Sequence, residues 1–193
     1  MRSRNHWMVL PVYLILAFLL LVAAFATFRI FVRRDYRRKG RLTWLSTFLE
    51  TLIFFLWGTF TWLDLPPGWP PSDVSPVLSV TGWTLIIVGL VTLFITMAGF
   101  GLRRSLGQEV NVLKQSGLYR LSRNPQTVAC ALAVIGYAML WPSWHTVGWM
   151  VLFGAIAHMM VLTEEEHLRN VYGDEYVQYC ERVPRYIGFP RGR

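Results

Sequence analysis

The chain has 193 residues, of which 54% are hydrophobic and only 16% are charged, and its formal net charge is +8 at pH 7. About a quarter of the residues in a soluble domain are normally charged, so this composition argues against an ordinary soluble domain. Two cysteines do not make a disulfide framework, and the sequence has no metal-ligand, nucleotide-phosphate or serine-hydrolase motif.

Five apolar runs predict five membrane-spanning helices. In chain order, they cover residues 8–32, 44–63, 77–101, 127–141 and 144–162. The first three reach the roughly 20 residues that cross about 30 Å of hydrocarbon as a helix. The fourth is short for a span, and the last two predict a tight hairpin. We therefore expect an all-α, polytopic membrane protein with a single membrane domain over residues 1–193.

The Lys and Arg residues alternate between the two predicted sides of the membrane in a consistent way. One side, formed by the segments after the first, third and fifth runs, has clusters that include Arg33, Arg34, Arg37, Arg38, Lys39, Arg103, Arg104, Arg120, Arg123, Arg182 and Arg185. Because such residues tend to remain cytoplasmic, we expect the N-terminus outside and the C-terminus in the cytoplasm. The positive charge then reflects topology and anionic membrane lipid, and nucleic acid is not an expected partner.

The start of the chain allows a second interpretation. A basic start, an apolar run and the small residues around Ala24 and Ala26 are also typical of a cleaved secretory signal peptide. Cleavage there would place the basic cluster from Arg29 to Arg41 outside, against the charge pattern. We therefore expect an uncleaved first helix.

The tail after the last run predicts a helix that continues out of the membrane. Glu164, Glu165 and Glu166 stand at its water boundary. Apolar and aromatic residues then recur at helical spacing, namely Leu168, Tyr172, Tyr176, Tyr179 and Val183. We expect Gly173 to break this helix and Asp174 to cap a second one. Taken alone, the glutamates favour a surface helix whose carboxylates pair with Arg169 and solvent.

Two polar segments read together resemble the integral-membrane methyltransferases, which include the isoprenylcysteine carboxyl methyltransferases and the phospholipid methyltransferases. The matching pieces are GLYRLSRNP (117–125), EEEHL (164–168), YGDEYVQY (172–179) and VPR (183–185), separated by a hydrophobic hairpin. The resemblance covers roughly residues 99–187. It implies a cofactor-binding methyltransferase core in residues 99–193, preceded by N-terminal membrane helices in residues 1–98.

The resemblance implies a site for S-adenosylmethionine at the cytoplasmic membrane boundary. By matched position, the residues expected to hold this cofactor are Gly117, Leu118, Tyr119, Asn124, Pro125, Glu164 and Glu165. Arg123 is the expected catalytic residue and acceptor contact, since a guanidinium holds a carboxylate or phosphate in a fixed fork. Its alternative role is a topology anchor that reaches toward water. Arg185, Tyr176 and Thr127 are further expected acceptor contacts.

Two positions depart from the family pattern. Thr127 replaces a tyrosine and Ala129 replaces a glycine. These changes affect the acceptor side of the predicted site, and they leave the acceptor open among a prenylcysteine-type carboxylate, a phospholipid amine and a small thiol. The oligomeric state is also open.

Two other classes of function stay open from the residues alone. One is a membrane reductase that uses NADPH, and the other is a non-enzymatic membrane scaffold. Two ionisable residues lie inside predicted spans. Glu50 is a candidate functional residue on that ground, and its alternative role is a structural hydrogen bond to Ser46, Thr47 or a neighbouring helix. His158 could line the pocket, but we expect a hydrogen-bonded core histidine.

Overall fold

The computed structural model describes residues 6–59, 74–100 and 113–188, and within these segments it contains helices and no strand. The regular elements are α1 (His6–Ala26), the π-helical turn η1 (Thr27–Val32), α2 (Arg33–Lys39), α3 (Trp44–Thr59), α4 (Pro76–Phe100), the 3₁₀ turn η3 (Gly117–Arg120), α6 (Pro125–Leu140), α7 (Trp144–Tyr172) and α8 (Asp174–Arg182). The predicted all-α fold is confirmed for these segments.

Three of the described helices are long and apolar enough to cross a membrane. They cover Leu10–Lys39, Pro76–Ala98 and Trp144–Tyr172. The other two apolar helices, α3 and α6, have 16 residues each. At 1.5 Å per residue a helix of that length spans about 24 Å, less than the hydrocarbon thickness. The count of five crossings therefore stays a prediction.

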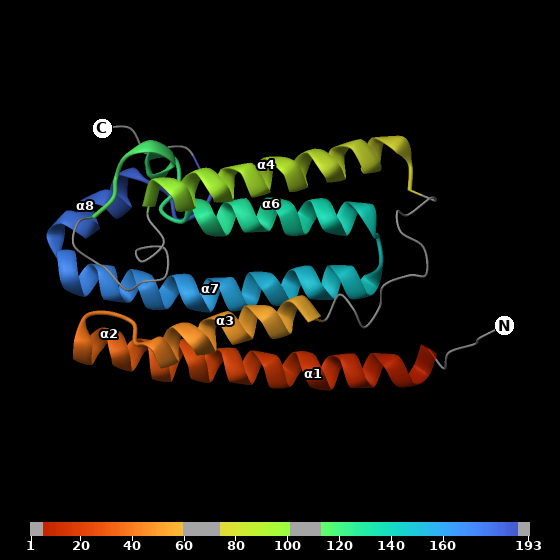
Figure 1. Ribbon diagram of the computed structural model, residues 1–193, viewed down its shortest axis with the longest axis horizontal. Coiled ribbons are helices and arrows are strands. Elements are labelled where there is room, and N and C mark those ends of the chain that lie inside the picture. The colour runs from red at the N-terminus through yellow and green to blue at the C-terminus, as the bar shows by residue number, and fades with distance from the viewer. Residues whose placement is uncertain (1–5, 60–73, 101–112, 189–193) are drawn as a thin grey trace.

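The helices form two groups on either side of α7, as Figure 1 shows. One group is the pair α4 and α6, which lie side by side along their lengths. The other is α1 with α3, which pack on the opposite side of α7. Turn η1 and α2 continue α1 without a break, so that one long helix runs the length of the molecule.

Small residues let α4 and α6 approach closely. A Cβ atom placed on Gly89 of α4 would lie 2.6 Å from the carbonyl oxygen of Ala129 in α6, and one on Gly136 would lie 2.5 Å from the carbonyl oxygen of Gly82. Close backbone contact through glycine and alanine is a common way for helices to pack in lipid. Ala129 is fully buried, and the glycine on the facing helix, Gly89, provides the space for it.

Aromatic and aliphatic side chains fill the space between α1, α3 and α7. Ala24 and Phe28 of the first long helix belong to this core and are fully buried. Trp57 of α3 and Trp149 of α7 stack with ring centroids 4.3 Å apart. Each indole N–H also donates to the other residue's carbonyl oxygen, at 3.0 and 3.1 Å. These paired hydrogen bonds satisfy polar groups that lipid would leave without partners.

Large apolar side chains cover the outside of the bundle. Phe94 of α4 is 74% exposed, and Phe18 of α1 and Phe55 of α3 are also exposed. A water-soluble surface rarely carries such continuous apolar area. Together with the long apolar helices, this surface identifies an integral-membrane protein.

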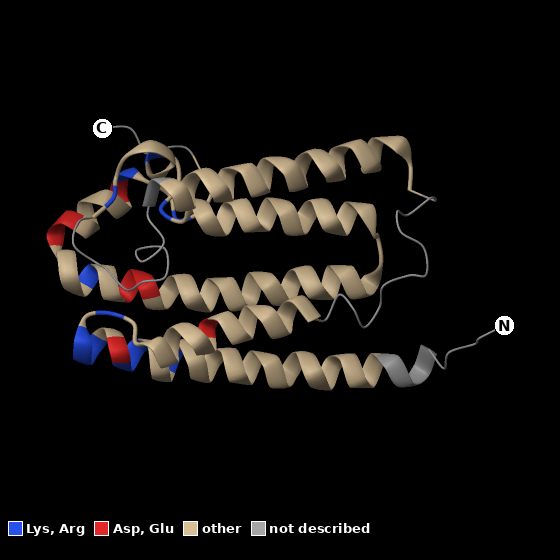
Figure 2. Ribbon diagram, in the orientation of Figure 1, with Lys and Arg blue, Asp and Glu red and all other residues tan. Residues whose placement is uncertain are grey.

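The charged residues gather at one end of the bundle. Figure 2 shows Lys, Arg, Asp and Glu concentrated where α2, the C-terminal part of α7, α8 and the loop before α6 come together. The two polar segments singled out in the sequence therefore lie at the same end of the molecule. This end contains the candidate site.

Candidate functional site

The loop before α6 has a conformation that its sequence explains. Gly117 begins the turn η3 with φ +63°, a left-handed conformation that side chains with a Cβ atom rarely adopt. Pro125 takes the first position of α6, as predicted, where its missing N–H costs no helical hydrogen bond. Asn124 precedes it at the N-cap position, but its side chain makes no capping hydrogen bond.

Hydrogen bonds hold this loop against the end of the tail. The backbone N–H of Arg123 donates to the carbonyl oxygen of Pro184 at 2.9 Å. The Nδ2 atom of Asn124 donates to the carbonyl oxygen of Arg185 at 3.1 Å, and the Ser122 hydroxyl donates to the same oxygen at 3.3 Å. The RNP and VPR motifs, about 60 residues apart in sequence, are therefore in direct contact.

Glu165 lies between two arginines. Its Oε2 atom accepts hydrogen bonds from Nε and Nη2 of Arg185, at 3.0 and 2.8 Å. Its Oε1 atom lies 3.2 Å from Nη1 of Arg123, and the side chains of Glu165 and Arg123 are only 5% and 11% exposed. The hydrogen bonds to Glu165 raise the pKa of the Arg185 guanidinium. The expectation that these glutamates lie on a surface helix and pair with Arg169 is therefore wrong, because tertiary partners outcompete the neighbour along the helix.

Two buried polar atoms of this cluster, Nε of Arg123 and Oε1 of Glu165, have no hydrogen-bond partner among the described residues. Arg123 Nη1 also donates to the sulfur of Cys180. Among the described residues, no group makes a hydrogen bond with Nε of Arg123, and Oε1 of Glu165, although close to Arg123, has no hydrogen bond of good geometry. Two guanidiniums and one carboxylate leave one positive charge, and of the two arginines Arg123 is nearly buried while the Arg185 side chain is 35% exposed. Buried polar groups normally have partners, so this arrangement fits a polar, partly anionic ligand.

Two buried tyrosines of α8 pack against the loop before α6. Tyr176 and Tyr179 of α8 are buried together with Val183, which confirms the predicted amphipathic stripe. The Tyr179 hydroxyl donates to the carbonyl oxygen of Tyr119 at 2.6 Å and so fixes the turn η3. Burial raises the pKa of the Tyr176 and Tyr179 hydroxyls well above the ordinary pKa of tyrosine, so both hydroxyls stay protonated even in mildly alkaline solution.

Glu164 faces a different neighbour from Glu165. Burial raises the pKa of the Tyr119 hydroxyl, and the negative charge of Glu164 nearby raises it further. Glu164 is half-buried, and within the described segments no cation pairs with it. A carboxylate in this position is available to bind hydroxyl or amino groups of a ligand.

The other predicted site residues are close in sequence to this cluster but make no polar contact with it among the described residues. Leu118 is half-buried in η3, and Thr127 is half-buried in the first turn of α6. Arg123 is nearly buried and paired, so it does not extend toward water as the anchor alternative requires.

Gly173 ends α7, which confirms the predicted break. Two smaller expectations are wrong, and the structural alternative for Glu50 is not seen at its Oε1 atom within the described part of the chain. Gly173 also occupies the N-cap of α8, while Asp174 is the first residue inside α8 and does not cap it. His158 is exposed, and its Nδ1 atom pairs with the Tyr186 hydroxyl at 2.9 Å, so it is not a core histidine. The Oε1 atom of Glu50 is buried without a hydrogen-bond partner among the described residues.

Ser122 is a site residue that was not among those predicted. This residue is buried, and besides its contact with Arg185 it accepts a hydrogen bond from the backbone N–H of Asn124 at 3.1 Å. A serine two residues before an Asn-Pro pair is a signal for such a turn, because serine hydroxyls commonly bond to backbone N–H groups two residues ahead.

Comparison with known proteins identifies one family. The phospholipid methyltransferase family model matches residues 77–175, just over half of the chain, from α4 to the first turn of α8. No curated protein and no solved structure matches the chain. The apolar helices and the matched region define an integral-membrane protein of methyltransferase type. The chain belongs to the phospholipid methyltransferase family, which is related to the isoprenylcysteine carboxyl methyltransferases.

Proposed function

We propose that this protein is an S-adenosylmethionine-dependent methyltransferase that methylates a lipophilic acceptor at the cytoplasmic membrane boundary. The family supports methyl transfer in a membrane. The observation that carries the proposal is the contact of Glu165 with both Arg123 and Arg185, which joins the loop before α6 to the tail. Two segments that are separate in sequence thereby form one polar site beside an apolar bundle.

The residues present fit this cofactor. Bound S-adenosylmethionine supplies an electrophilic methyl group on a sulfonium ion. Glu164, which pairs with no cation among the described residues, suits the ammonium or ribose hydroxyl groups of such a ligand, and the excess positive charge of Arg123 and Arg185 suits its carboxylate. Positioning of reactants and exclusion of water supply much of the rate in such transfers, so no metal is required.

We propose a phospholipid amine as the acceptor. The family description supports this class. Glu164 has no cationic partner among the described residues, and such a carboxylate suits a headgroup amine, whose proton must leave before methylation, better than an acceptor carboxylate, which it would repel. The exposed apolar surface of the bundle suits an acceptor that enters from the lipid.

We also propose that the charged end of the molecule faces the cytoplasm, with the N-terminus on the other side. The clustering of Lys and Arg at this end supports the orientation. Reporter fusions at the two termini test it. A cytoplasmic signal from the N-terminal fusion together with an external one from the C-terminal fusion would contradict it.

Equilibrium binding to the purified chain in nanodiscs tests the cofactor assignment, with S-adenosylmethionine and NADPH as alternative ligands. We expect binding of S-adenosylmethionine and its loss in Glu164→Ala and Asn124→Ala. Glu181→Ala, which changes an exposed residue of α8, is the matched control. Binding of NADPH instead would favour a reductase, and binding of neither would favour a scaffold. Unchanged affinity in both site variants would contradict the proposed site.

A further inference from the structure

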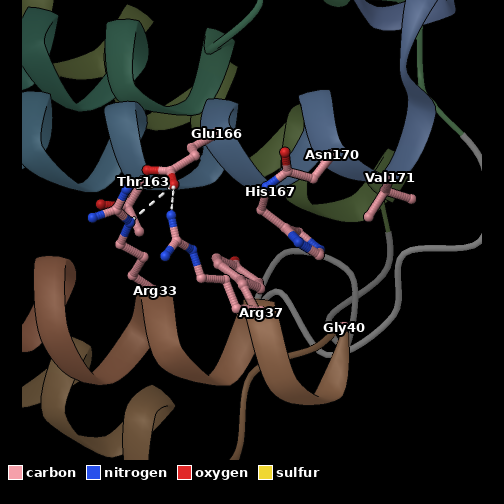
Figure 3. Close-up of a pocket in the computed structure, with 9 residues that line it drawn as sticks. Arg33, Arg37, Gly40, Thr163, Glu166, His167, Asn170 and Val171 are labelled. Carbon is pink, nitrogen blue, oxygen red and sulfur yellow. Dashed lines mark hydrogen bonds and ion pairs between the residues drawn. The ribbon is translucent and has the colours of Figure 1, made fainter.

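A second pocket lies between α2 and α7, on a different side of α7 from the candidate site (Figure 3). Its volume is about 270 Å³, close to the lower end of the range for small-molecule sites, and so it suits a headgroup rather than a whole lipid. The polar lining residues that matter here are Arg33, Arg37, Glu166, His167 and Asn170.

The pocket has an excess of positive charge. Glu166 Oε1 accepts hydrogen bonds from Nε and Nη2 of Arg33 at 2.9 and 2.7 Å, and from Nη2 of Arg37 at 3.0 Å. Arg29, one turn earlier, lies 3.6 Å from Oε2 of the same carboxylate. Among the lining residues, two guanidiniums and one carboxylate leave one positive charge, and Arg29, which does not line the pocket, adds a further cation beside it. Arg37 is exposed and uses one of its five N–H donors in this contact, so it has donors for a ligand.

His167 gives the pocket a buried polar wall. It is only 5% exposed, and its ring stacks on that of Tyr36 with centroids 4.0 Å apart. The ring makes a hydrogen bond with the backbone of Gly40, and its Nε2 atom has no hydrogen-bond partner in the part of the chain that the structure describes. Figure 3 shows His167 reaching from α7 toward α2, while Arg33 and Arg37 reach from α2 toward Glu166 on α7. The cationic donors beside this wall suit an anionic group.

The position of the pocket indicates the source of that anion. It lies at the polar end of the candidate span Leu10–Lys39, where a bilayer has its headgroups. Just before Arg33, the exposed side chains of Ile30 and Phe31 offer an apolar surface for acyl chains. One ion pair between Glu166 and an arginine would be enough to join α7 to α2. The further arginines at this carboxylate are therefore available to bind a ligand.

We propose that this pocket binds the phosphate group of an anionic membrane phospholipid. The arginines hold the phosphate oxygens, and the His167 ring forms the wall behind them. The site is separate from the candidate methyltransferase site, because Glu166 faces α2 whereas Glu165 faces the loop before α6 and the tail. The proposal therefore does not rest on the proposed function, and the bound lipid is a stabilising ligand rather than the methyl acceptor.

Native mass spectrometry of the full chain in mild detergent tests this site. Phosphatidylglycerol or phosphatidylcholine is added, and the protein-bound lipid is counted. We expect phosphatidylglycerol to be retained preferentially and Arg37→Gln to weaken its retention about fivefold, as the loss of one arginine contact near a membrane surface implies. Arg38→Gln is the matched control, because Arg38 is exposed on the same helix but does not line the pocket.

Three results would overturn the proposal. Equal weakening by Arg37→Gln and Arg38→Gln would show diffuse attraction instead of a site. Equal retention of phosphatidylcholine would show no need for net negative charge. Thermal stabilisation by inorganic phosphate equal to that by phosphatidylglycerol would assign the pocket to a soluble phosphate. Binding of S-adenosylmethionine should be unchanged in Arg37→Gln, so failure here is distinguishable from failure of the proposed function.

Discussion

Glu165 Oε1 and Arg123 Nη1 lie 3.2 Å apart, with both side chains nearly buried. One residue belongs to α7 and the other to the loop before α6, so this contact joins the two polar segments of the chain. Arg185 completes the cluster from the end of the tail. The candidate site thus depends on one carboxylate that holds two cations, and its removal should affect both folding and binding.

Glu165→Gln should destabilise the protein strongly. The change leaves Arg123 without its counter-charge in a nearly buried place, and breaking a buried pair from one side costs about 3 kcal/mol or more, whereas Arg185 is partly exposed and loses less. Thermal unfolding in detergent micelles measures the effect. Glu181→Gln, which removes an exposed carboxylate from α8, is the control. If the two variants unfold at the same temperature, the Glu165 cluster does not stabilise the fold as described.

Arg123→Lys should lower methyl transfer more than it lowers stability. Lysine keeps the positive charge near Glu165 but loses the planar fork that also reaches Cys180. We expect transfer to fall by about tenfold, the size of one lost charge-assisted contact. Arg120→Lys, at an exposed position of the same loop, should have no effect. Wild-type transfer rates in Arg123→Lys would remove this residue from the catalytic site.

The buried tyrosines predict the pH dependence of stability in the alkaline range. Burial raises the pKa of Tyr119, Tyr176 and Tyr179, so folding disfavours their ionisation. Their contribution to stability is therefore complete below the pKa of unfolded tyrosine, about 10, and is lost as the pH rises above it. Chemical unfolding at increasing pH should show no tyrosine-linked change near neutrality and a decline above about pH 10. Tyr179→Phe should make that decline less steep, and an identical decline in the variant would count against the assignment.

Gly136→Ala should disrupt the pairing of α4 and α6. A Cβ atom there would lie 2.5 Å from the carbonyl oxygen of Gly82, a backbone atom that cannot move aside alone. Overpacking of this kind typically costs about 1–3 kcal/mol. Gly154→Ala in α7 is the control, because its Cβ atom would meet nothing within 4 Å. Equal thermal stability of the two variants would mean that the close helix contact is not required.

Much of the fold follows from the apolar runs of the sequence. The prediction of a helix over 127–141 agrees with α6 to within two residues at its start, and the expectation that the glutamates continue the last membrane helix is confirmed by α7. Run length alone could not settle how many helices cross the bilayer, because α3 and α6 are too short to decide it. The pairing of Trp57 with Trp149 depends on tertiary packing that no local pattern records.

The candidate site was predictable in its location but not in its contacts. The two motifs were expected to meet, and they do so through Arg123 and Glu165. Helical spacing suggested Arg169 as the partner of the glutamates, whereas consecutive glutamates point to different neighbours, Glu165 to Arg185 and Glu166 to Arg33. Those partners are about 20 and 130 residues away, beyond the reach of any local rule.

Transfer of label from methyl-labelled S-adenosylmethionine, with the purified chain reconstituted into vesicles, tests the central claim most directly. The vesicles contain phosphatidylethanolamine, and separate reactions offer a prenylcysteine or a small thiol. We predict label in the phospholipid fraction, and no label with Glu164→Ala. Label confined to the prenylcysteine or thiol would contradict the proposed acceptor, and no label in any fraction would contradict the methyltransferase itself.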